Sequence, residues 1–102
     1  MSDALEVKQV RGHIVSAMGS FYPNGMSGRM IFEEVVQPIF PTVEWDGLMQ
    51  EVTYLKQRGF VEIVGDLGER NASARRKFYR LTAVGYDLAT GVSTDDAIAR
   101  VV

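Results

Sequence analysis

The stretch that decides the fold reads YLKQRGFVEIV over residues 54–64 and, after a polar interval, KFYRLTAVG over residues 77–85. The first part begins as the end of a helix, because Leu48, Val52 and Leu55 recur at helical spacing just before and within it. Gly59 then offers the left-handed conformation that ends many helices. The pattern after Gly59 changes to that of a strand, so the stretch predicts a helix that ends at a glycine and passes directly into β-structure.

The rest of the stretch predicts a β-hairpin. Residues 60–64 and 77–81 are rich in aromatic and β-branched side chains, which strands favour. The interval 65–76 contains the turn-forming residues Gly65, Asp66, Gly68, Asn71 and Ser73. Thr82 is a good N-cap for a short helix that would end at Gly91.

Helices are predicted on both sides of the hairpin. An apolar stripe at three- and four-residue spacing predicts a first helix over residues 4–20. Ser27 could cap a second helix that must end near Gln37, because Pro38 follows it, and Thr42 could cap a third helix over residues 43–58. Residues 93–101 resemble a capped final turn or two of helix. The predicted fold is α+β: a winged helix-turn-helix with a three-helix core, a two-stranded β-hairpin wing and C-terminal helices.

Composition is consistent with one small globular domain over residues 1–102, with helices in 1–59, the wing in 60–81 and the C-terminal helices in 82–102. The chain is 46% hydrophobic and has no cysteine, which excludes a disulfide framework. It contains no apolar run near the ~20 residues that a membrane span needs, and its N-terminus lacks a signal-peptide pattern. We therefore expect a cytoplasmic protein without a membrane partner.

The charge of the chain is unevenly distributed around a formal net charge of −2. Residues 1–59 carry seven acids and five bases, residues 60–81 three acids and five bases, and residues 82–102 three acids and one base. The positive charge is thus concentrated in the hairpin. Proteins that bind DNA through phosphates usually carry such a basic region.

In the third helix, Gln50, Thr53 and Tyr54 are predicted to face outward, where they could contact DNA bases or phosphates. The same helix carries the acidic residues Glu44, Asp46 and Glu51, and no Lys or Arg lies between residues 43 and 54. An acidic helix is repelled by phosphates. A solvated helix or a surface for a protein partner is therefore an open alternative at this helix.

The wing segment combines small polar residues with four bases over residues 70–77. This composition suits contact with the DNA backbone or insertion into a minor groove. The alternative is a solubilising hairpin tip whose charges pair with Asp66 and Glu69. The candidate DNA-binding residues of the wing are Arg70, Asn71, Ser73, Arg75, Arg76 and Lys77.

No catalytic or metal-binding constellation is recognisable. His13 stands alone on the first helix, without a second histidine or a carboxylate at the spacing of metal ligands. The glycines between residues 19 and 28 lack the order of a phosphate-binding loop, and no nucleophile motif is present. We expect no enzyme activity, no cofactor and no metal.

Residues 42–91 resemble winged-helix regulators of the PadR, MarR and ArsR kind, which show a similar Leu-to-Gly helix end and an aromatic strand running into Leu81-Thr82. In length and layout, the chain is also similar to small winged-helix proteins of transposable phages and prophages. The resemblance implies a homodimer formed by the first and last helices that places two recognition helices in successive major grooves of double-stranded DNA. The apolar stripe of the first helix and the apolar end Ile98, Val101 and Val102 could supply that dimer surface or simply close the core.

The function expected from these features is a DNA-binding transcriptional regulator. The alternative is a protein-interaction module, in the manner of a phage accessory protein, that keeps the fold without reading DNA. Because 102 residues leave no room for a separate effector domain, we expect any effector to bind at the dimer interface.

Overall fold

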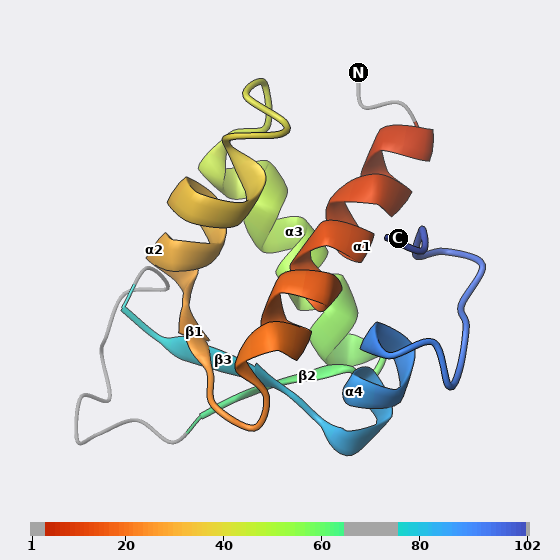
Figure 1. Cartoon of the computed structure of the whole chain (residues 1–102). Helices are drawn as coiled ribbons and strands as arrows, with labels where there is room; N and C mark the ends of the chain where they lie inside the picture. The colour runs from red at the N-terminus through yellow and green to blue at the C-terminus, as the bar shows by residue number, and fades with distance from the viewer. Residues whose placement is uncertain (1–3, 65–75, 102) are drawn as a thin grey trace.

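The computed structural model describes residues 4–64 and 76–101, which form four α-helices, a π-helical segment and a three-stranded antiparallel sheet (Figure 1). The predicted α+β class is confirmed. The elements in chain order are α1 (Ala4–Phe21), β1 (Met26–Ser27), α2 (Gly28–Met30), η1 (Ile31–Val36), α3 (Trp45–Gln57), β2 (Val61–Ile63), β3 (Phe78–Leu81) and α4 (Ala83–Ala89).

Helix α1 lies at the centre of the molecule and contacts α3, η1, α4 and β3 (Figure 1). Its apolar stripe includes Val10, Ile14 and Met18, and each of these side chains is at most 2% exposed. Burying an aliphatic side chain of this size contributes about 1.5–3 kcal/mol to folding. The stripe that could have formed a dimer surface therefore closes the core of the monomer.

The sheet has three strands in the order β1-β3-β2, not the two predicted. Val61 of β2 lies opposite Leu81 of β3, and Met26 of β1 lies opposite Tyr79 on the other side of β3. All four side chains are buried on the sheet face that packs against the helices. Strand β1 was not predicted, because its two residues are too few to show an alternating pattern.

The second helix has the predicted start and extent, but its second half is wider than an α-helix. The Met30 N–H donates to Ser27 Oγ at 3.1 Å, so Ser27 is the N-cap of α2, as predicted. From Ile31 to Val36 the backbone is π-helical, and the Gln37 N–H donates to Phe32 O, five residues earlier, at 2.9 Å. Hydrophobic spacing alone does not distinguish these two helix types over so short a segment.

Helix α3 starts later than predicted. The prediction that Thr42 caps it is wrong: the N-cap is Glu44, which makes no side-chain capping bond, and the Val43 N–H donates to Phe40 O in a preceding turn. The other end is as predicted, because Gly59 has a φ of 80°. The N–H groups of Gly59 and Phe60 donate to Lys56 O and Leu55 O, both at 3.0 Å, which ends the helix in a Schellman motif.

Thr82 is the N-cap of α4, as predicted. Its Oγ1 accepts a hydrogen bond from the Gly85 N–H at 3.1 Å and donates one to Gly59 O at 2.6 Å. The same hydroxyl therefore starts α4 and ties it to the end of α3.

The predicted final helix over residues 93–101 is wrong, and α4 is the one helix in the described residues after the hairpin. The Asp95 carboxylate accepts from the Ala97 N–H at 2.8 Å, an interaction that competes with helix formation. Residues 91–101, the C-terminal segment, instead run back along α1, where the Ala99 N–H donates to Lys8 O at 2.9 Å. Only a glycine fits beneath this crossing: a Cβ on Gly12 would lie 2.1 Å from Ala99 O.

Candidate functional site

Helix α3 presents one face to solvent. Asp46, Gln50, Thr53 and Gln57 recur at three- and four-residue spacing, opposite the buried Leu48, Val52 and Leu55. All four are exposed, and together they line a shallow groove with Met49 and Tyr54. Among the described residues, none of the four side chains makes a hydrogen bond or ion pair within the protein. We call these four residues the outward face of α3.

A second side of α3 is bound to the rest of the protein. Glu51 pairs with Arg11 of α1 at 2.8 Å, and the two side chains are only 14% and 17% exposed. Arg11 also stacks on the ring of Tyr54, with its Cζ 3.6 Å from the ring centroid. Arg58 donates to Tyr54 Oη at 3.1 Å and to the Asp95 carboxylate at 2.6 Å. We call Glu51, Tyr54 and Arg58 the tethered side of α3.

This arrangement changes the charge expected at the site. The sequence places Glu51 among three acids on a helix predicted to face outward, but in the structure it points at α1 and its charge is matched by Arg11. Asp46 is the acid that remains on the outward face, and Glu44 precedes the helix. Lys56 is exposed, and helical spacing places it on the same side of α3 as Trp45. The Trp45 ring packs edge-on against Phe32 of η1, with 5.5 Å between ring centroids.

The structure brings two of the three predicted helix residues together as expected. Gln50 and Thr53 lie side by side on the outward face. Tyr54 lines the same groove but is half-buried, with one ring face covered by Arg11 and its hydroxyl bound by Arg58. Its ring is therefore held in place by these two arginines.

Basic residues lie where α2 begins beside the hairpin. The Gly28 N–H donates to Lys77 O at 3.0 Å, so the start of α2 is in direct contact with the start of β3. This contact brings Arg29 close to Arg76 and Lys77 along the backbone. Arg29 is 71% exposed, and its hydrogen bond to Glu33 at 2.6 Å raises the pKa of the guanidinium. Arg76 is exposed and Lys77 is half-buried. Among the described residues, this corner therefore holds three basic side chains, one of which is paired with Glu33.

Four predicted wing residues lie outside the described residues, namely Arg70, Asn71, Ser73 and Arg75. Further along β3, Arg80 is paired with Glu62 of β2 at 2.7 Å, with both side chains 45% exposed. Its charge is therefore compensated on the open face of the sheet.

Sequence reasoning missed three residues of this surface. Gln57 extends the outward face by one turn, and its spacing of seven from Gln50 and four from Thr53 is the signal that could have identified it. Lys56 could have been placed on its side of α3 by the same spacing. Arg29 gave no such signal, because its position depends on the pairing of β1 with β3.

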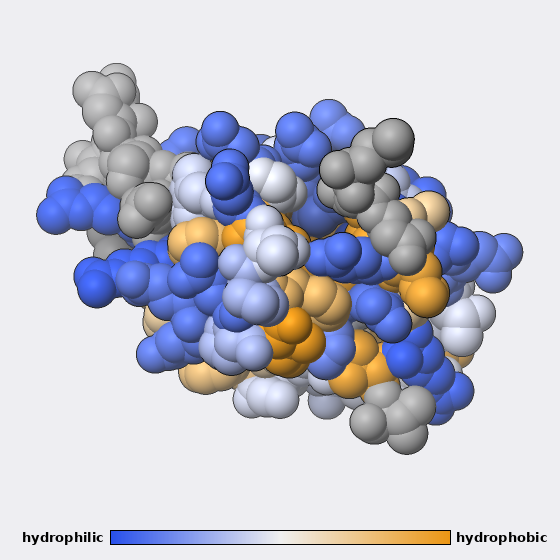
Figure 2. Space-filling model, turned by 90° about the horizontal axis from the view of Figure 1, so that it is seen from above, coloured by the Kyte–Doolittle hydropathy of each residue, from blue (hydrophilic) through white to orange (hydrophobic). Residues whose placement is uncertain are grey.

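The described residues offer neither a metal site nor a membrane span. In residues 4–64 and 76–101, no three His, Asp or Glu side chains gather closely enough to hold a metal ion. His13 packs edge-on against Phe40, with 5.4 Å between ring centroids. No helix within the same ranges is both long and apolar enough to cross a bilayer. Figure 2, which views the molecule from above, shows hydrophilic residues over much of this face with hydrophobic patches between them.

Comparisons of the chain with protein-family models, with curated proteins and with solved structures gave no match. The arrangement of α3, the sheet and the nearby basic residues is therefore the basis for assigning a function.

Proposed function

We propose that this chain is a winged-helix protein that binds double-stranded DNA and regulates transcription, as a cytoplasmic homodimer without cofactor or catalytic activity. The outward face of α3 would enter the major groove. The hairpin between β2 and β3 would act as the wing and hold the DNA backbone together with Arg29.

The order of the elements supports this assignment. A helix, a short strand, a second helix, a third helix and then a hairpin follow one another, with β1 joined to the hairpin in one sheet. In winged-helix proteins the third helix of this order is the recognition helix, and α3 occupies that position. The exposure of its outward face along its whole length is what a helix in the major groove requires.

The observation that carries the proposal is the withdrawal of Glu51 from the outward face by Arg11. It leaves Gln50, Thr53 and Gln57 there, all uncharged and able to donate or accept hydrogen bonds at base edges or phosphates. Asp46 is compatible with such a surface, because a carboxylate can accept from the amino group of cytosine. The acidity of the sequence is thus no longer an argument against DNA contact along most of the helix.

Binding to DNA is tested with random-sequence duplex at two salt concentrations, with the oligomeric state measured on the same sample by light scattering. We expect a dimer whose affinity falls steeply as salt rises, because phosphate contacts release counterions. Absence of binding at low salt would overturn the proposal and favour a protein-interaction module that uses the acidic start of α3, Glu44 and Asp46.

A matched pair of variants locates the binding surface. Gln50→Glu and Gln9→Glu each add one negative charge to an exposed helical position, but Gln9 lies on α1, away from the outward face of α3. We expect Gln50→Glu to weaken DNA binding and Gln9→Glu to leave it nearly unchanged. Equal effects of the two substitutions would show that only net charge matters and would remove α3 from the interface.

A further inference from the structure

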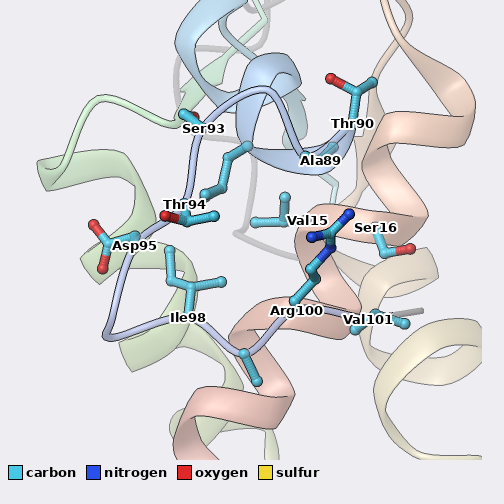
Figure 3. Close-up of a pocket in the computed structure, with 14 residues that line it drawn as sticks. Val15, Ser16, Ala89, Thr90, Ser93, Thr94, Asp95, Ile98, Arg100 and Val101 are labelled. Atoms are coloured by element: carbon cyan, nitrogen blue, oxygen red, sulfur yellow. The ribbon is translucent and has the colours of Figure 1, made fainter.

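A cavity of about 240 Å³ lies between α1, the end of α4 and the C-terminal segment (Figure 3). Val15 of α1, Leu88 of α4 and Ile98 of the C-terminal segment give it an apolar floor. Thr94 and Ser16 also line it (Figure 3). Its volume lies just below the usual range for small-molecule sites, so it suits a compact ligand. We call it the C-terminal cavity.

The positive charge at this cavity comes from Arg100. Its side chain rises from the C-terminal segment toward α1 and α4 (Figure 3), and a Cβ placed on Gly91 would lie 2.9 Å from Arg100 Nη2. No described carboxylate pairs with Arg100. Asp95, the acid that lines the cavity, is already bound to Arg58 and to the Ala97 N–H. Within residues 4–64 and 76–101, the cavity therefore offers a guanidinium without a carboxylate partner, beside an apolar floor.

We propose that the C-terminal cavity binds a short-chain organic carboxylate. The carboxylate pairs with the guanidinium of Arg100, which presents a planar set of donors that matches two carboxylate oxygens. The hydrocarbon chain lies on Val15, Leu88 and Ile98, where it is removed from water. A ligand that lacks either part loses one of these two contributions.

A purely structural role for Arg100 is the alternative. A cation near the C-terminal end of α4 interacts favourably with the helix dipole, without any ligand. This role predicts that loss of Arg100 lowers stability and leaves binding of a carboxylate unchanged, so the two roles can be separated by measuring both quantities.

Occupancy of the cavity would reach α3 through the C-terminal segment. The segment that carries Arg100 and Ile98 also carries Asp95, which binds Arg58, and Ala97, whose carbonyl accepts from Arg11 at 3.1 Å. A ligand that holds this segment in place therefore also holds the tethered side of α3. Resonances of Arg58 and Tyr54 should report binding although neither residue lines the cavity.

The test is an NMR titration of the full chain with hexanoate, and with acetate, 1-hexanol and hexylamine as comparison probes. Hexanoate should give saturable shifts at Val15, Ile98 and Arg100, with acetate, hexanol and hexylamine at least about tenfold weaker because each lacks the apolar chain or the negative charge. No saturable shifts with hexanoate, or equal affinity for hexylamine, would overturn the proposal. The titration contains no DNA, so its outcome is independent of the proposed DNA binding.

Three variants make the assignment specific. Arg100→Gln should weaken hexanoate binding about tenfold, and Thr94→Phe should block the cavity with a larger side chain. Arg80→Gln removes an exposed arginine on the sheet and should leave binding unchanged. If Arg100→Gln lowers the melting temperature but not the affinity for hexanoate, Arg100 only stabilises α4 and the proposed carboxylate site is excluded.

Discussion

The tethered side and the outward face of α3 are built from similar kinds of residues and used in opposite ways. On the tethered side, Glu51, Tyr54 and Arg58 are all bound by Arg11 or Asp95. On the outward face, the polar side chains make no bond within the described residues. One helix thus separates polar groups that hold the fold from polar groups that are available to a partner.

The difference teaches that a count of charges along a helix does not give the charge of its surface. Glu51 and Asp46 are equivalent in such a count, yet Glu51 is paired with Arg11, which is only 17% exposed, and Asp46 faces water. Substitutions on the two sides should therefore affect different properties: stability on the tethered side and DNA binding on the outward face.

The largest expected effect is that of Arg11→Ala. It removes the ion pair to Glu51, the hydrogen bond to Ala97 O and the stacking on Tyr54, and it leaves a carboxylate that is 14% exposed without its partner. We expect a loss of about 3 kcal/mol in the free energy of unfolding, measured by urea denaturation. A loss as small as that of an ordinary surface substitution would break the distinction between the two sides.

Next comes the double substitution Gln50→Ala and Thr53→Ala on the outward face. We expect the free energy of unfolding to change by less than about 0.5 kcal/mol for each substitution, because neither side chain has a partner in the described residues. Affinity for the specific DNA site, once selected from a random library, should fall by about 1–3 kcal/mol. A stable variant with unchanged DNA affinity would show that the outward face does not read bases.

The double substitution Arg75→Ala and Arg76→Ala tests the wing. These residues are expected to contact phosphates, so their loss should weaken binding to all sequences alike and reduce the slope of log K against log salt by about 0.9 for each contact. Binding isotherms at several salt concentrations measure the slope. An unchanged slope would remove this part of the wing from the interface.

The smallest effect is expected for Glu62→Ala, which breaks the ion pair with Arg80. Both side chains are 45% exposed, and such pairs contribute at most about 1 kcal/mol. Compared with Arg11→Ala in the same urea experiment, this variant sharpens the contrast between a shielded ion pair and an exposed one. A loss equal to that of Arg11→Ala would mean that burial does not set the difference.

The parts of the fold that sequence predicts well are those determined by near neighbours. The end of α3 at Gly59 and the start of α4 at Thr82 depend on bonds within a few residues, and both were predicted. Strand β1 and the path of residues 93–101 depend on pairing with β3 and α1, which no local pattern encodes. These were the elements that sequence analysis missed or assigned to the wrong class.

The candidate site divides in the same way. Helical periodicity places Gln50 and Thr53 on the outward face, because exposure there follows from the buried stripe of the same helix. The pairing of Glu51 could not be predicted, since its partner Arg11 is 40 residues away in the sequence. Long-range pairs of this kind decide which polar residues remain available.

The contacts of Arg11 also have a consequence for the order in which the chain folds. Its partners Glu51 and Ala97 lie 40 and 86 residues away in the sequence. The contact between Arg11 and Ala97 therefore cannot form until the C-terminal segment has been synthesised. Contacts across such long loops form late, because the entropy of closing the loop opposes them. On the ribosome, α1 and the sheet can begin to pack while Arg58 still lacks Asp95. Asp95 and Ala97, which emerge after α3, would then complete the ordering of that helix.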